Sequence, residues 1–259
     1  MSRRRETFEV AEPARLVVRL QAGRVEVTEG APGLVAVTVD GPLADGFVVE
    51  QSGPVVTVRQ QDARWGGSGF HNLTVEAPAG TSVDASLASA DLTASMPVGD
   101  LTVKVASGQV RAGRVGGDLD VKTASGDLLV EQVVGRLRVA SASGDVRIGA
   151  VGGSAVCTTA SGDVSVGSAT GDLEVKTASG DASVQRFEGS EFRAKTVSGD
   201  ARLHLPSGRT VEVDAHTLTG EVRLPKPLED QPSPSLDPNR RRVRLVFHSV
   251  SGDLEVVPG

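Results

Sequence analysis

The sequence repeats a short phrase at a fixed spacing, and this repeat limits the folds open to the chain more than any other feature. A Ser-Gly step, nearly always followed by Asp, recurs with 18 residues between its glycines at the first four intervals and 19 at the last. A second glycine series lies midway between them. The two series are Gly108, Gly126, Gly144, Gly162, Gly180 and Gly199, and Gly99, Gly117, Gly135, Gly153, Gly171 and Gly189. The basic unit is therefore nine residues long, and two unlike units make one 18-residue repeat.

Apolar and polar residues alternate within each unit. Counted from the glycine, the third and fifth positions are apolar, as at Leu119 and Val121, while the fourth and sixth are mostly polar, as at Asp120 and Lys122. Because successive side chains of a strand point to opposite faces, this pattern predicts a short, half-buried strand. The eighth position is apolar again in most units, as at Ala124, and we expect it to point inward at a corner. The Gly-Asp step supplies the turn.

Two architectures satisfy this pattern, a meander of antiparallel hairpins and a β-solenoid in which each repeat forms one coil. Only the solenoid requires identity at 18 residues, because each residue then lies on its counterpart about 4.8 Å away. We therefore expect an all-β fold, a single-stranded β-solenoid (β-helix) with 18-residue coils of two nine-residue units.

The regular repeat occupies only part of the chain, and the ends differ from it. An open solenoid end is an unpaired strand edge and needs a cap. We expect residues 1–87 to form an irregular, sandwich-like β cap continuous with the solenoid, and residues 88–224 to form the regular coils. Residues 225–242 are predicted to be a Pro-rich loop, and residues 243–259 to be closing strands.

Composition excludes several classes of protein. Aromatic residues make up 3% of the chain, so the core must consist of Val, Leu, Ile and Ala in thin layers. The net charge is −6, which argues against nucleic-acid binding because such proteins usually carry a basic surface. Cys157 is the only cysteine, so the sequence predicts neither an internal disulfide nor a cysteine metal site.

The sequence contains no targeting or membrane signal. No apolar run reaches the length of about 18 residues that a membrane-spanning helix needs. Glu6, Glu9 and Glu12 interrupt the N-terminal segment, which therefore lacks the apolar stretch of a secretory signal. We expect a protein of the cytoplasm.

Four segments together resemble a bacterial β-strand-repeat family whose members are often named "putative adhesins" and grouped as toastrack-like domains of unknown function. The segments are GRVEVTEGAPGLVAVTV (23–39), LTVEAPAGTSVDASLASADL (73–92), the Gly-Asp repeats and SVSGDLEV (249–256), and they cover almost the whole chain. The resemblance implies a β-solenoid of unknown molecular role. It implies no catalytic residues.

One aspartate of each repeat is expected to stack on the next along one corner of the solenoid. These residues are Asp127, Asp145, Asp163, Asp181 and Asp200. Carboxylates about 5 Å apart repel, so one interpretation is a ladder of bound cations. The sequence lacks the G-G-x-G-x-D pattern of calcium-binding nonapeptides. We therefore favour a structural ladder in which each aspartate accepts backbone N–H bonds within its own turn.

The lysines of the sixth position are also expected to stack. Lys104 would lie on Lys122, and Lys176 on Lys195, with polar or small residues interrupting the row between the two pairs. Acidic residues such as Asp120 and Glu174 lie on the same outward side. This arrangement predicts a solvated face of mixed charge rather than a strip that binds a polyanion.

Two further residue types predict no chemistry. Cys157 occupies the fifth position, where its counterparts are valines, and is expected to be a buried core residue rather than a nucleophile. The four histidines are scattered through the sequence and predict no metal site. They are His71, His204, His216 and His248.

The best candidates for partner contacts lie outside the repeats. The Gly-rich stretch 62–72 contains Trp65, Phe70 and His71, which would either contact a partner or plug the open end of the solenoid. Arg240, Arg241 and Arg242 follow the Pro-rich segment and form either an exposed hinge or a contact with an acidic partner.

No set of residues in the sequence assembles a nucleophile, a base and an oxyanion site. We therefore predict no catalytic, cofactor-binding or metal-ligating residue and no cofactor. The expected function is a non-enzymatic structural or protein-interaction module that binds a protein partner or a second copy of itself. The alternatives are a carbohydrate- or cell-envelope-binding module and a polysaccharide-active β-helix enzyme. Scarce aromatic residues weaken the first alternative, and short turns weaken the second.

Overall fold

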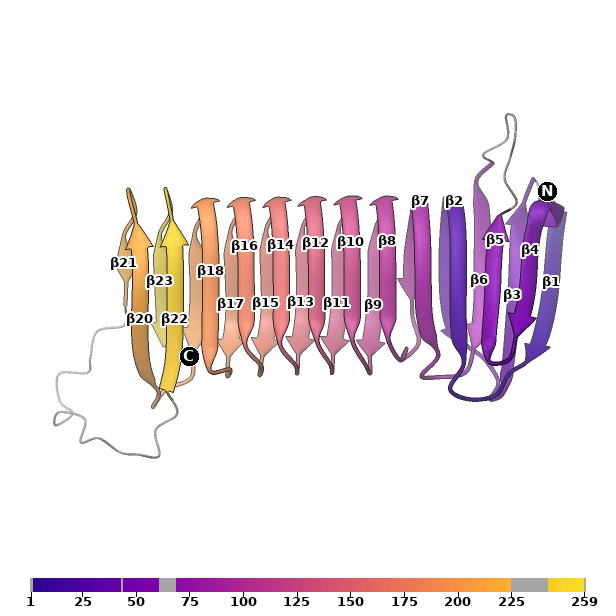
Figure 1. Cartoon of the computed structure of the whole chain (residues 1–259), viewed down its shortest axis with the longest axis horizontal. Helices are drawn as coiled ribbons and strands as arrows, with labels where there is room; N and C mark the ends of the chain where they lie inside the picture. Colours follow the sequence, from indigo (N-terminus) through magenta and orange to yellow (C-terminus); the bar gives the residue numbers. More distant parts are fainter. Residues whose placement is uncertain (1, 43, 61–68, 225–241, 259) are drawn as a thin grey trace.

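The computed structural model describes residues 2–42, 44–60, 69–224 and 242–258. Within these ranges the protein is all-β, with 23 strands in one continuous sheet and a single 3-10 helix, η1 (Ala44–Gly46). The strands stack side by side into a long rod (Figure 1). None of the described segments is a helix long and apolar enough to cross a bilayer.

The regular coils each contain two strands, one on each face of the rod. The first face carries β8 (Leu101–Ser107), β10 (Leu119–Ser125), β12 (Leu137–Ser143), β14 (Ala155–Ser161), β16 (Leu173–Ser179) and β18 (Glu191–Ser198). The second face carries β9 (Val110–Val115), β11 (Leu128–Val133), β13 (Val146–Val151), β15 (Val164–Ala169), β17 (Ala182–Phe187) and β19 (Ala201–Leu205). Neighbours on each face are parallel and in register at 18 residues, so that Val121 lies between Val103 and Val139. The predicted solenoid is confirmed, because a meander would pair these strands antiparallel.

The core lies between the two faces and is built from the third and fifth positions of each unit. Leu119, Val121, Leu128 and Val130 are all at most 2% exposed, as the alternation predicts. Thin layers of Val, Leu and Ala therefore fill the rod, and they form a single connected hydrophobic cluster.

The prediction for the eighth position is wrong on the first face. There Ala106, Ala124, Ala142, Ala160 and Ala178 are exposed. The reason is that each first-face strand keeps its alternation one step further, so that the seventh residue (Thr159 in β14) points inward and the eighth points outward. On the second face the prediction holds, and Val115, Val133, Val151, Ala169 and Phe187 are buried.

A ladder of glycines makes the turn from the first face to the second. Gly144 has a φ of +121°, and a Cβ added there would lie 2.4 Å from the carbonyl oxygen of Gly126 in the preceding coil. The same conflict recurs at the equivalent glycines of the other coils. Only glycine fits, because the turn needs both an unusual backbone conformation and close contact with the coil beneath it.

The N-terminal end is capped by antiparallel strands, as predicted for this region. β2 (Arg15–Glu29) and β7 (Ser82–Ala94) each run along both faces of one coil, and β5 (Val55–Gln60) and β6 (His71–Ala77) share another. β2 lies between the β5–β6 coil and β7 (Figure 1). β1 (Ser2–Glu9), β3 (Leu34–Gly41) and β4 (Phe47–Ser52) pair antiparallel outside them. The boundary expected after residue 87 lies inside β7, since this strand already pairs in parallel with β8.

The C-terminal strands do not form the outermost coil, which corrects their predicted closing position. β22 (Arg242–Ser249) pairs with β18 on one side and with β20 (Thr210–Thr217) on the other. β23 (Leu254–Pro258) likewise lies between β19 and β21 (Val222–Arg223). The strands nearest the end of the chain are therefore inserted one coil before the end of the rod (Figure 1). Arg242, expected in the loop, is the first residue of β22 and pairs with Thr210.

Candidate functional site

The predicted aspartate ladder exists, but its hydrogen bonds run between coils rather than within one turn. The Oδ1 atom of Asp127 accepts the backbone N–H of Asp145 at 3.0 Å. The same bond recurs from Asp145 to Asp163, Asp181, Asp200 and Asp253 at 2.8 to 3.1 Å. The expectation of bonds within each turn is wrong because the turn places each carboxylate beneath the N–H of the next coil. The carboxylates thus bind the protein's own backbone.

A second, shorter ladder lies at the turns on the opposite edge. Asp100 accepts from the backbone N–H of Asp118, and Asp118 accepts from that of Arg136. The Arg136 guanidinium also binds Asp118 at 2.7 Å. This side-chain hydrogen bond lowers the pKa of the Asp118 carboxyl from its ordinary value. Because the pair is exposed, we assign it a structural role of small energy.

The outward side chains of the sixth position form one registered row along the first face. Its members all lie on adjacent strands at the same register position: Arg59, Arg19, Ser86, Lys104, Lys122, Ala140, Thr158, Lys176, Lys195, His248 and His216. Stacking of the two lysine pairs is as predicted. The structure adds the two arginines at one end and the two histidines at the other. We call this set the cationic row.

A second row of exposed apolar side chains lies two residues further along the same strands. It comprises Ala106, Ala124, Ala142, Ala160, Ala178, Val197, Val250 and Leu218. At its C-terminal end the side chains are large, and Val197 and Leu218 are 54% and 80% exposed. We call this set the apolar row. It was missed because the eighth position was expected to point inward.

Two depressions open over these rows. One, of about 830 Å³, is lined by Arg19, Lys104 and Lys122 among others. The other, of about 400 Å³, is lined by residues that include Lys195 and Val250. The surface along the first face is therefore hollowed at both ends of the cationic row.

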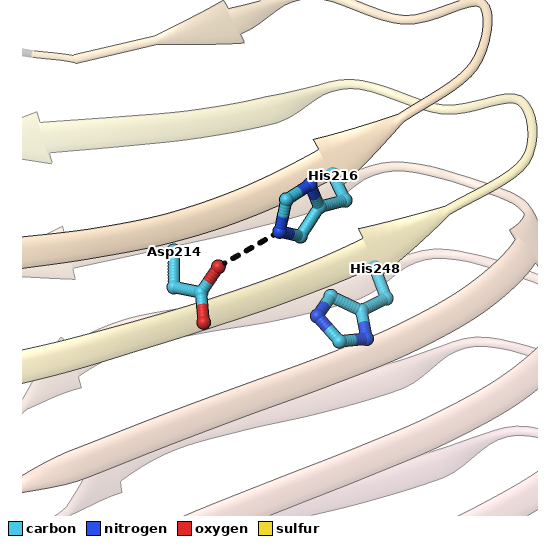
Figure 2. A group of neighbouring side chains, drawn as sticks. All are labelled: Asp214, His216 and His248. Carbon is cyan, nitrogen blue, oxygen red and sulfur yellow. Dashed lines mark ion pairs between the residues drawn. The ribbon is translucent and has the colours of Figure 1, made fainter.

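The histidines at the end of the cationic row correct a second prediction. His216 of β20 and His248 of β22 lie in register on adjacent strands, and Asp214 precedes His216 by two residues on the same side of β20. Figure 2 shows the three side chains gathered on one surface. His216 Nε2 is 3.1 Å from Asp214 Oδ1, and the two imidazole centroids are 5.5 Å apart. The histidines are thus not scattered in space.

A signal for this pair was present in the sequence. His216 and His248 each lie four residues before the glycine of a turn, as Lys195 does before Gly199. The glycine spacing changes to 21 and then 32 residues at this end of the chain, so a fixed period of 18 hides the shared position.

The candidate contact residues outside the repeats have different surroundings. Trp65, Arg240 and Arg241 lie outside the described residues. Phe70 is 61% exposed and Arg242 is exposed, as a contact residue requires. His71 differs from its prediction, because it begins strand β6 and is fully buried with its ring 5.1 Å from that of Phe47.

Comparison with known proteins supplies a family. The family profile of Toastrack DUF4097 matches residues 14–256. The chain belongs to the Toastrack DUF4097 family. The match covers more than half of the chain and includes every coil described above. A search of curated proteins finds no match.

Solved structures share the toastrack fold. A "putative adhesin" from Bacteroides fragilis is similar at a TM-score of 0.52 and 11% identity, covering 99% of this chain and 97% of that one. A "putative adhesin" from Parabacteroides distasonis has a TM-score of 0.42 and 17% identity, with the same coverage. At this identity the first similarity shows the fold alone.

Cys157 is the one thiol of this toastrack domain, and it lies in the core. It pairs in register with Val139 and Val175 and is 1% exposed. Desolvation by burial raises the pKa of its thiol to about 12. A nucleophilic cysteine needs a lowered pKa and an accessible position, so Cys157 serves the packing of the core.

Proposed function

We propose that this toastrack domain is a non-catalytic protein-interaction module that binds an extended acidic segment of a partner along the first face. The observation that carries the proposal is the cationic row with the apolar row beside it. Both rows repeat at the spacing of neighbouring strands, about 4.8 Å. The two rows together offer charge and apolar contact along one line.

The charges of the cationic row are largely available to a partner. Lys104, Lys122 and Lys195 are exposed and make no ion pair with any described residue, whereas Lys176 pairs with Glu174 at 3.0 Å. The whole chain carries a net charge of −6, so the row is a local positive feature on an acidic molecule. Such a distribution favours one orientation of an approaching acidic segment.

The apolar row gives the interaction a direction. Its small alanines lie along the middle coils, while Val197, Val250 and Leu218 lie beside the smaller depression. Burying large aliphatic side chains contributes more free energy than burying alanine. We therefore expect the apolar residues of the partner to bind at the C-terminal end, with the acidic residues along Lys104 and Lys122.

The surroundings of the titratable groups support the absence of catalysis in this proposal. Among the described residues, the groups with clearly shifted pKa values are Asp118, Arg136, Cys157 and Arg223. Three of them belong to exposed ion pairs, and the pKa of the fourth is raised by burial. An activated base or nucleophile has a pKa shifted toward its working pH, which none of these shifts produces.

Charge reversal on the two faces tests the proposal. The Lys104→Glu and Lys122→Glu double variant changes the cationic row, and the Arg111→Glu and Arg147→Glu double variant makes the same charge change on the second face. Partners captured from the native lysate would be identified, and the bound segment synthesised and titrated calorimetrically. We expect the first variant to weaken binding by more than about ten-fold and the control to retain it.

Three outcomes would overturn the proposal. The first is equal binding by both variants. The second is a captured segment without acidic residues. The third is retention of a glycan instead of a protein, which would favour a carbohydrate-binding module. Circular dichroism of each variant would verify the fold before any titration.

A further inference from the structure

The two histidines and the aspartate at the end of the cationic row form a set of metal-ligating groups. One ligand atom from each of Asp214, His216 and His248 lies within 4.8 Å of the other two. The groups come from two separate strands, since Asp214 and His216 belong to β20 and His248 to β22. We propose that this cluster binds a divalent transition-metal cation, with Zn²⁺ as the best fit.

The backbone sets the positions of these side chains. β20 and β22 are parallel, and His216 pairs in register with His248. Residues two apart on a strand point to the same side, which places Asp214 beside His216. Val213 and Ala215 alternate with them and pack against the core. The three candidate ligands therefore point outward together, as Figure 2 shows.

The distances suit a small cation. Tetrahedral zinc has ligand bonds of about 2.0–2.2 Å, which put neighbouring ligand atoms about 3.4 Å apart. His216 Nε2 and Asp214 Oδ1 are already 3.1 Å apart. The His248 ring is exposed, so a change in its side-chain torsions can bring a nitrogen to the third position.

The ligand types select the class of metal. Two imidazoles and one carboxylate favour zinc, copper, nickel or iron, whereas calcium and magnesium need a set of oxygen ligands. Three protein ligands leave at least one coordination position for water. The resulting site would join the outermost strand of the first face, β20, to its neighbour.

The surrounding charges both assist and oppose a cation. Arg244 lies 3.8 Å from Asp214 Oδ2, on the other oxygen from the one that faces His216. This contact leaves Oδ1 for the metal. Lys195 lies next to His248 in the cationic row and repels a cation, while Glu212 lies two residues before Asp214 and attracts one. The site therefore has a carboxylate to balance each nearby lysine or arginine.

Metal titration of purified protein tests the inference. Zn²⁺ binding would be measured by calorimetry, and Co²⁺ would report the coordination geometry by its visible spectrum. We expect one Zn²⁺ per chain and no comparable binding of Mg²⁺ or Ca²⁺. Because the metal binds only the folded state, it should also raise the melting temperature.

Substitutions identify the ligands. His216→Ala, His248→Ala and Asp214→Asn should each weaken Zn²⁺ binding by more than about ten-fold and abolish the Co²⁺ spectrum. His204→Ala is the matched control, since it removes a histidine of β19 outside the cluster, and it should bind as the natural chain does. Unchanged affinity in His248→Ala, or no saturable Zn²⁺ binding by the unaltered protein, would overturn the inference. The three ligands are at the surface, so loss of folding is not expected to obscure the result.

Discussion

A residue in the middle of this solenoid has its own counterpart above and below it, so its surroundings are repeated from coil to coil. Cys157 shows the effect, because it occupies a place that valine fills in both neighbouring coils. The register makes its burial predictable from sequence. The exposure of Ala124 was not predictable in the same way, since it depends on where each strand ends its alternation.

Burial leads to a prediction for the chemistry of Cys157. With its thiol pKa raised to about 12, only about one molecule in ten thousand carries a thiolate at pH 8. We expect the folded protein to resist alkylation by iodoacetamide and the urea-unfolded protein to react fully. Mass spectrometry over a time course measures both. Rapid modification of the folded chain would mean that the coil opens locally, or that the thiol is not buried.

At the scale of the strand and its turn, the aspartate ladder connects each coil to the next. The stacking of the five aspartates could be predicted from the period alone. Their hydrogen bonds could not, because the sequence does not show whether a carboxylate reaches its own turn or the N–H of the next coil. The register in space decides this, and the bond from Asp181 N–H to Asp163 Oδ1 is 2.9 Å long.

The ladder predicts different effects for two substitutions at one position. Asp163→Ala leaves the N–H of Asp181 without its acceptor and should lower the free energy of unfolding by about 1–2 kcal/mol. Asp163→Asn keeps an oxygen acceptor and removes one charge from a row of carboxylates, so its effect should be smaller. Urea unfolding compares the two. Equal losses would show that the carboxylate charge, rather than the acceptor, stabilises the turn.

At the scale of the whole molecule, both ends of the rod are completed by strands inserted out of sequence order. The repeat predicts the middle coils, because each contacts only its neighbours. It does not predict that β22 lies between β18 and β20, since the contact between β20 and β22 joins segments whose spacing departs from 18 residues. The same departure from the period hid the His216–His248 pair.

The inserted strand predicts a local response to a core mutation. Phe247 of β22 is 1% exposed and lies in register between Ala194 and Ala215. Phe247→Ala should cost about 3–5 kcal/mol and increase hydrogen exchange in β20 to β23, while the middle coils stay protected. Hydrogen-exchange mass spectrometry maps the change. Phe70→Ala, the same substitution at an exposed site, is the control and should leave exchange unchanged. Uniform loss of protection along the rod would contradict the prediction.

The inserted strands also govern the order in which the molecule can be completed during translation. The ribosome releases β20 before β22, although β22 separates β20 from the rest of the rod. β2 likewise emerges before both of the coils that flank it. The middle coils can dock one after another as they appear, but each end must wait for strands that emerge later. Growth of the nascent chain from one end to the other therefore cannot by itself finish either end of the rod.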